Sequence, residues 1–141
     1  MHLSRALVTI LLAAALGAAS VQAATVSPWG KRANPLCAVA SAKLKKLTEP
    51  TSVKSSAPYY AKVRAIAIDL TGELKAIPAP TPAAKTALKA QGVVNTAIGR
   101  VVTAARTGRQ ALLNAAFAEA ATADSKADAA FKAAGAATCA D

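Results

Sequence analysis

The sequence predicts an all-α protein: a small, alanine-rich four-helix bundle of up-down-up-down topology, closed by one disulfide between its chain ends. Alanine supplies 33 of the 118 residues from 24 to 141, and alanine is the strongest helix former. The larger apolar residues recur at the 3.6-residue spacing of amphipathic helices. Cys37 and Cys139 stand near the two ends of this segment. These three observations define the expected fold over residues 34–141.

The first helix is expected from Asn34 to about residue 48. Asn34 suits the N-cap position and Pro35 the first helical position. Residues 24–33 contain Pro28 and Gly30 and are predicted to form an irregular tail. Trp29 in this tail is expected to dock on the bundle, with anchoring of a partner as the alternative.

The second helix is expected from Pro58 to about residue 76, after a loop over residues 49–57. One face of this segment carries a continuous apolar stripe: Tyr60, Val63, Ile66, Ala67, Leu70, Leu74 and Ile77. The 3.6-residue period of this stripe makes it the best-specified helix of the chain.

The third helix is expected to begin with Thr81 as N-cap and Pro82 after it. Gly92 and Gly99 lie seven residues apart on one face and predict a close approach between helices. A break at Gly108 places the fourth helix at about residues 109–137. Alternatively, the third helix continues through Gly108 and the chain turns near residues 122–125.

The cysteines and the predicted topology support each other. In an up-down-up-down bundle the first helix begins at the end where the fourth helix finishes, which brings Cys37 and Cys139 together. The bridge would close a loop of 103 residues, for which chain entropy predicts roughly 4–5 kcal/mol of stabilisation. Two free thiols are the alternative.

Residues 1–23 have the layout of a secretory signal peptide. Arg5 precedes an apolar run over residues 6–19, and Val21 and Ala23 are small residues at the −3 and −1 positions of a cleavage site. We expect a mature protein that starts at Ala24, is secreted or associated with the cell envelope, and has no transmembrane segment. An even number of cysteines suits such an oxidising compartment.

The sequence argues against catalysis. The one histidine is His2, in the expected signal peptide, so the mature chain has no histidine for a metal site or for a Ser-His-Asp or Cys-His arrangement. No phosphate-binding glycine loop or nucleophile elbow occurs. We therefore predict no catalytic residue, no metal site and no cofactor.

Basic residues are concentrated in the first three quarters of the mature chain. Residues 24–110 hold 14 Lys and Arg against 3 acidic residues, whereas residues 111–141 have two more acids than bases. This asymmetry predicts a cationic face for an anionic partner, an envelope polymer or a protein. Nucleic acid is the least expected partner, because aromatic residues are scarce. A solvated surface without a partner is the alternative. The candidate residues are Lys31, Arg32, Lys43, Lys45, Lys46, Lys85, Lys89, Arg100, Arg106 and Arg109.

Aromatic side chains suggest a second function, the carriage of an apolar or haem-like ligand between helices. Tyr59 and Tyr60 are the candidate ligand contacts with Trp29, because a tyrosine phenolate can bind haem iron. The structural alternative is that Tyr60 packs in the core. The sequence leaves the oligomeric state open.

Overall fold

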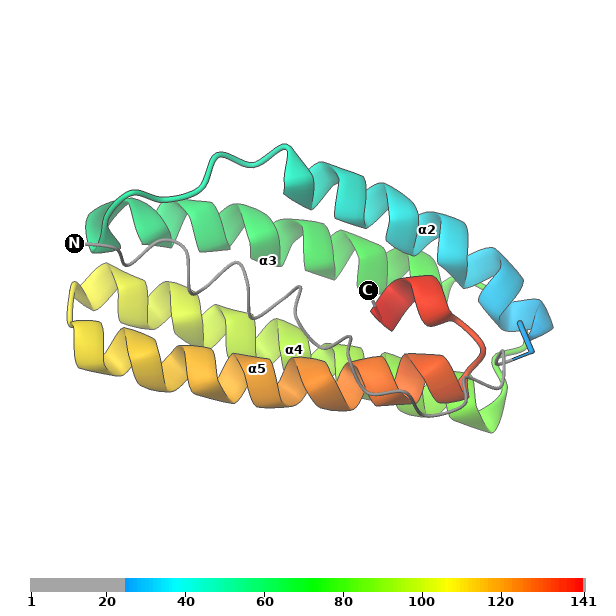
Figure 1. Ribbon diagram of the computed structural model, residues 1–141. Coiled ribbons are helices and arrows are strands. Elements are labelled where there is room, and N and C mark those ends of the chain that lie inside the picture. The colour runs from blue at the N-terminus through cyan, green and yellow to red at the C-terminus, as the bar shows by residue number, and fades with distance from the viewer. Residues whose placement is uncertain (1–24, 141) are drawn as a thin grey trace, which may run out of the picture.

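The computed structural model of the protein describes residues 25–140 and shows four helices (Figure 1). The expected signal peptide, residues 1–23, lies outside the described residues. A short 3-10 helix follows the fourth α-helix, and no strand occurs among the described residues. The predicted all-α class is confirmed. The elements are α2 (Pro28–Lys45), α3 (Val53–Lys75), α4 (Pro82–Thr107), α5 (Gln110–Ala133) and η2 (Ala137–Ala140).

Successive helices run in opposite directions, with α2 packed on α3, α3 on α4 and α4 on α5 (Figure 1). The η2 turn folds back after α5 and contacts both α2 and α5. The start of α2 and the end of the chain therefore meet at one end of the bundle. There Cys37 and Cys139 form the predicted disulfide, with a Cα–Cα distance of 5.0 Å.

The first helix begins at Pro28, so the prediction of an irregular tail over residues 24–33 is wrong for its second half. Ser27 is the N-cap, and its hydroxyl accepts a hydrogen bond from the Gly30 N–H at 2.9 Å. Ser27-Pro28 and Asn34-Pro35 carry the same capping signal, and the chain uses the earlier one. Asn34 lies inside α2, where its side-chain oxygen accepts a bond from the Thr138 N–H.

Burial of Trp29 accounts for the two additional turns of α2. The Trp29 side chain is only 3% exposed and stacks on Phe131 of α5, with ring centroids 6.4 Å apart. The same stretch buries Ala33 completely. The docking expected for Trp29 is confirmed, but it occurs on a helix rather than on a tail.

The second helix also begins earlier than predicted, at Val53 instead of Pro58. Ser52 and Ser55 form a reciprocal capping box, in which each side chain accepts a bond from the other residue's N–H. Pro58 therefore lies within α3, near its start, where the missing N–H removes one intrahelical bond. The predicted loop over residues 49–57 ends at Ser52.

The third helix begins where the sequence predicts and ends at Gly108, the first of the two alternatives that the sequence leaves open. The Thr81 hydroxyl accepts a bond from the Ala84 N–H at 3.1 Å, and Pro82 follows it. Gly108 ends α4 in the left-handed conformation, with φ of 68°. Because α5 begins at Gln110 and continues to Ala133, the alternative turn near residues 122–125 does not form.

The core has two parts. Around the disulfide, Trp29, Leu74 and Phe131 pack among alanines of α2, α4 and α5. At the other end, Val101 and Leu113 form a smaller cluster against Tyr60 and Phe117. Alanines at many core positions let the helix backbones approach closely, and this fixes how the surface residues of neighbouring helices lie beside one another.

Candidate functional site

The largest concentration of the predicted cations lies on α2. Lys31 and Arg32 stand near the start of this helix, and three lysines stand at its other end: Lys43, Lys45 and Lys46. All five side chains are exposed. No acidic residue occurs between residues 28 and 46, so no carboxylate on the same helix neutralises them.

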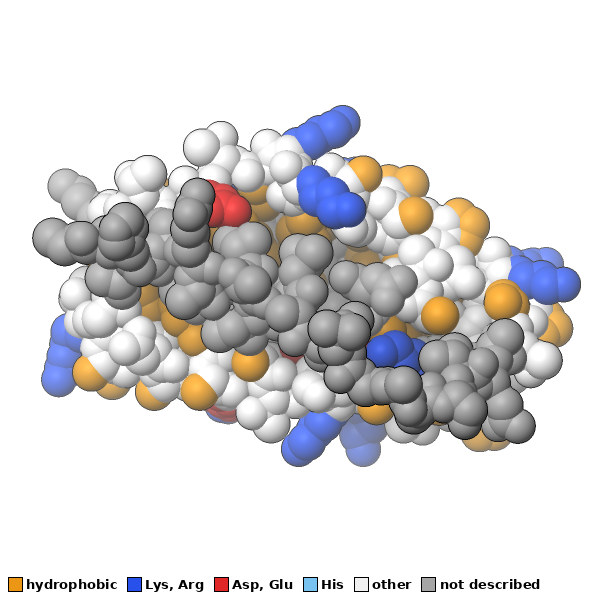
Figure 2. Space-filling model, in the orientation of Figure 1, with side chains coloured by type: hydrophobic (Ala, Val, Ile, Leu, Met, Phe, Trp, Pro, Cys, Tyr) orange, Lys and Arg blue, Asp and Glu red, His pale blue; other side chains and the backbone are white. Residues whose placement is uncertain are grey.

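An exposed apolar stretch separates the two basic ends of α2. Val39 is 52% exposed, and Pro35, Ala38 and Ala42 are exposed beside it. Figure 2 shows Lys and Arg side chains at both ends of α2, with hydrophobic side chains between them. We call this surface, made of the five cations and these four apolar residues, the α2 face.

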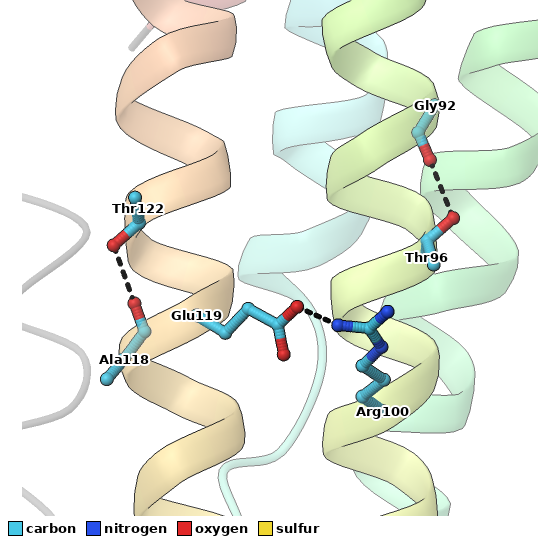
Figure 3. A network of polar contacts seen from close by, with 6 residues as sticks. All are labelled: Gly92, Thr96, Arg100, Ala118, Glu119 and Thr122. Atoms are coloured by element: carbon cyan, nitrogen blue, oxygen red, sulfur yellow. Dashed lines mark hydrogen bonds and ion pairs between the residues drawn. The ribbon is translucent and has the colours of Figure 1, made fainter.

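The other five predicted cations are not part of the α2 face. Lys85 and Lys89 are exposed on α4, and Arg106 and Arg109 are exposed near the turn between α4 and α5. Arg100 forms an ion pair with Glu119 and joins α4 to α5 (Figure 3). The ten cations are thus distributed around the bundle, and the α2 face is the part that gathers five of them.

A groove on the α3–α4 side holds two arginines, Arg64 and Arg106. Arg64 is not among the residues that the sequence predicts for an anionic partner. The expectation that Gly92 and Gly99 bring helices together is wrong, because a Cβ at Gly92 would meet nothing within 4 Å. A Cβ at Gly99 would lie 3.1 Å from Nε of Arg64, so this glycine accommodates a side chain.

A polar contact between the helices lies beside this groove. The Asn95 side chain on α4 donates to the Thr71 hydroxyl on α3 at 2.9 Å, and Thr71 donates to the Ala67 carbonyl. The Arg64 Nε donates to the Asn95 carbonyl at 3.4 Å. These bonds fix how α3 and α4 are rotated against each other and thereby position Arg64.

Tyr59 and Tyr60 pack against each other and against α5. Their rings meet edge to face with centroids 4.9 Å apart, and Tyr60 contacts Phe117 with centroids 5.1 Å apart. Burial, followed by the nearby Tyr59 and Glu49, raises the pKa of Tyr60 to about 12. The raised pKa makes the phenolate that binds haem iron harder to form at Tyr60 than at an ordinary tyrosine.

The carboxylates and the helices add three observations. Burial raises the pKa of Asp124 on α5 above its usual value. Among the described residues, no three His, Cys, Asp or Glu side chains lie close enough together to hold a metal ion. Within the same part of the chain, no helix combines the length and the apolar character needed to cross a membrane.

Comparison of the chain with known protein families, with curated proteins and with solved structures finds no match.

Proposed function

We propose that this protein is an exported, non-catalytic binding protein whose α2 face contacts an anionic polymer of the cell envelope. The observation that carries the proposal is the set of five exposed cations on one helix without an acidic residue. A polyanion that meets such a helix releases condensed counterions, and this release favours binding.

The arrangement along α2 suits an extended partner better than a compact one. Arg32 and Lys43 are eleven residues apart, which corresponds to about 16 Å along a helix. A polymer chain with repeated negative charges can reach both basic ends at once, while the apolar stretch around Val39 contacts its uncharged part. A single small anion could reach only one end.

Export supports this partner class. The signal-peptide pattern in residues 1–23 directs the chain out of the cytoplasm, and the Cys37–Cys139 disulfide suits an oxidising compartment. Outside the cytoplasm the abundant polyanions are surface polymers. The mature sequence has no histidine, and this supports binding rather than acid–base catalysis.

The test measures binding of protein expressed from the full sequence to immobilised dextran sulfate, with neutral dextran as the reference. We expect binding to dextran sulfate alone. The triple variant Lys43→Gln, Lys45→Gln, Lys46→Gln removes three charges from the α2 face and should weaken binding at least about tenfold.

A matched control removes three charges elsewhere, by Lys62→Gln, Lys126→Gln and Lys132→Gln. This variant has the same net charge as the α2 variant, so a specific α2 face predicts a much smaller loss of binding. Equal losses in the two variants would show that net charge alone attracts the polymer, and the proposed face would then be wrong.

A further inference from the structure

The groove between α3 and α4 combines an apolar floor with two cations. Its volume is about 260 Å³. Ile68 is 44% exposed there, although it is a large aliphatic residue. The groove is lined by Ala61, Arg64, Ala65, Ile68, Gly99, Val102, Thr103 and Arg106.

Arg64 is held in place within this groove. Its Nε donates to the Asn95 carbonyl, and its guanidinium lies against Gly99, where an added Cβ would be 3.1 Å from Nε and would require the arginine to shift slightly. Because the Nε hydrogen is used by Asn95, the two terminal nitrogens remain available. Those two nitrogens present the N–H groups that bind a carboxylate or phosphate in a bidentate manner.

Arg106 supplies the second cation of the site. It lies on α4, the helix that also carries Gly99. It follows Gly99 by two helical turns, and side chains on a helix lean toward the helix N-terminus, which directs Arg106 back toward Arg64. Neither arginine forms an ion pair with a described carboxylate. Two unneutralised guanidinium groups beside one groove favour a negatively charged ligand.

A second groove of about 560 Å³ continues from Arg106 toward the start of α3. Val53, Ala57 and Ala105 line it, and Arg106 belongs to both grooves. The walls of the first groove are mid-helix segments of α3 and α4 whose backbone groups are already paired, and the second groove also includes helix ends at Val53, Thr107 and Gly108. An extended peptide would find no partners for its own N–H and C=O groups along the first groove, whereas a hydrocarbon chain needs none.

We propose that this continuous trough binds an anionic amphiphile, with a carboxylate or phosphate headgroup between Arg64 and Arg106 and a hydrocarbon chain along the apolar walls. The site lies apart from the α2 face and concerns a different ligand, so it goes beyond the polymer binding proposed above. Failure of either proposal leaves the other intact.

The test is calorimetric titration, below the critical micelle concentration, of protein expressed from the full sequence. The probes share a twelve-carbon chain: laurate, dodecyl phosphate, neutral dodecyl maltoside and cationic dodecyltrimethylammonium. We expect the two anionic probes to bind at least about tenfold more tightly than the neutral and cationic ones, and more tightly than inorganic phosphate. A preference between laurate and dodecyl phosphate identifies the headgroup.

Variants locate the site. Arg64→Gln and Arg106→Gln should each weaken binding of the preferred probe about tenfold, because each removes a charge-assisted hydrogen bond. Gly99→Ala places a Cβ 3.1 Å from the Arg64 Nε without any change of charge and should also weaken binding. Arg100→Gln removes one charge on the same helix outside the groove and should bind like the natural protein. Circular dichroism melting verifies that each variant folds.

Three results would overturn the proposal. Neutral dodecyl maltoside could bind as tightly as the anionic probes, or Arg100→Gln could weaken binding as much as Arg64→Gln. A glutamate-rich peptide could bind more tightly than either anionic amphiphile, which would assign the trough to a peptide partner instead.

Discussion

Gly30 and Gly135 make a close backbone contact, where the start of α2 meets the segment after α5. A Cβ at Gly30 would clash with the Gly135 carbonyl oxygen. Gly135 itself has φ of 72°, a conformation that side chains with a Cβ rarely adopt. Ser27 donates to the Ala134 carbonyl at 2.6 Å across the same contact. This junction positions Trp29 and the disulfide.

The substitution Gly30→Ala should destabilise the protein by about 2 kcal/mol or more, because the clash is with backbone and no flexible side chain can move aside. Urea unfolding followed by circular dichroism measures the change. The control is Gly72→Ala on α3, where a Cβ meets nothing within 4 Å, and it should add up to about 1 kcal/mol through helix propensity. Equal effects at the two glycines would contradict the close contact.

Tyr60 makes stability depend on alkaline pH. Its pKa is raised to about 12 in the folded protein, above the value of 10.0 for an ordinary tyrosine, chiefly by burial. The unfolded chain therefore ionises first, and the free energy of unfolding should fall as pH rises from 10 to 12. Tyr60→Phe should reduce this slope in urea titrations at fixed pH values. An identical slope in Tyr60→Phe would assign the effect to other groups.

Among the elements, the start of α4 could be predicted and the start of α2 could not. Thr81 caps α4 by local chemistry, whereas the end of α4 at Gly108 is one of two layouts that the sequence leaves open. The start of α2 depends on a choice between two equivalent caps. That choice is decided by the packing of Trp29 on Phe131, a residue about one hundred positions away in the sequence.

The candidate site shows the same division between local and long-range causes. The five cations of the α2 face could be identified from the sequence by the charge asymmetry, but their common surface could not, because the sequence predicts Lys31 and Arg32 in an irregular tail and the structure places them on α2. The groove with Arg64 and Arg106 could not, because it depends on how α3 and α4 are rotated, and the Asn95–Thr71 bond sets that rotation. Gly99 was the one sequence signal for this groove. The sequence predicts a helix packed against this glycine, whereas the structure places the Arg64 side chain there.

The start of α3 depends on its capping box. Ser52→Ala removes the acceptor for the Ser55 N–H and should reduce the free energy of unfolding by about 1 kcal/mol. The neighbouring substitution Thr51→Ala removes a hydroxyl that does not cap the helix. It serves as the control in thermal unfolding. A loss in Thr51→Ala as large as in Ser52→Ala would show that the capping box does not set this helix end.

The whole molecule combines a thin, alanine-rich core with one bridge across nearly its full length. Cys37 and Cys139 are 102 positions apart, and the loop that they close is large enough for chain entropy to contribute roughly 4–5 kcal/mol. Reduction should lower the free energy of unfolding by about this amount in urea titrations with and without a reductant. The double variant Cys37→Ser, Cys139→Ser should match the reduced protein in both conditions. An unchanged midpoint after reduction would show that packing alone maintains the bundle.

The whole molecule also carries an excess of positive charge, with 17 Lys and Arg against 7 Asp and Glu. The fold does not neutralise this excess. The α2 face and the α3–α4 groove place part of this charge at two separate surfaces. The first suits an extended polyanion, and the second suits a single anionic headgroup with a hydrocarbon chain.

The salt dependence of dextran sulfate binding tests the proposed role of the α2 face most directly. The logarithm of the binding constant should fall linearly with the logarithm of salt concentration, because counterions are released. Removal of Lys43, Lys45 and Lys46 should make that slope shallower by about 2–3, whereas the matched variant at Lys62, Lys126 and Lys132 should retain it. A binding constant that does not change with salt, or equal slopes in the natural protein and the α2 variant, would contradict the proposal.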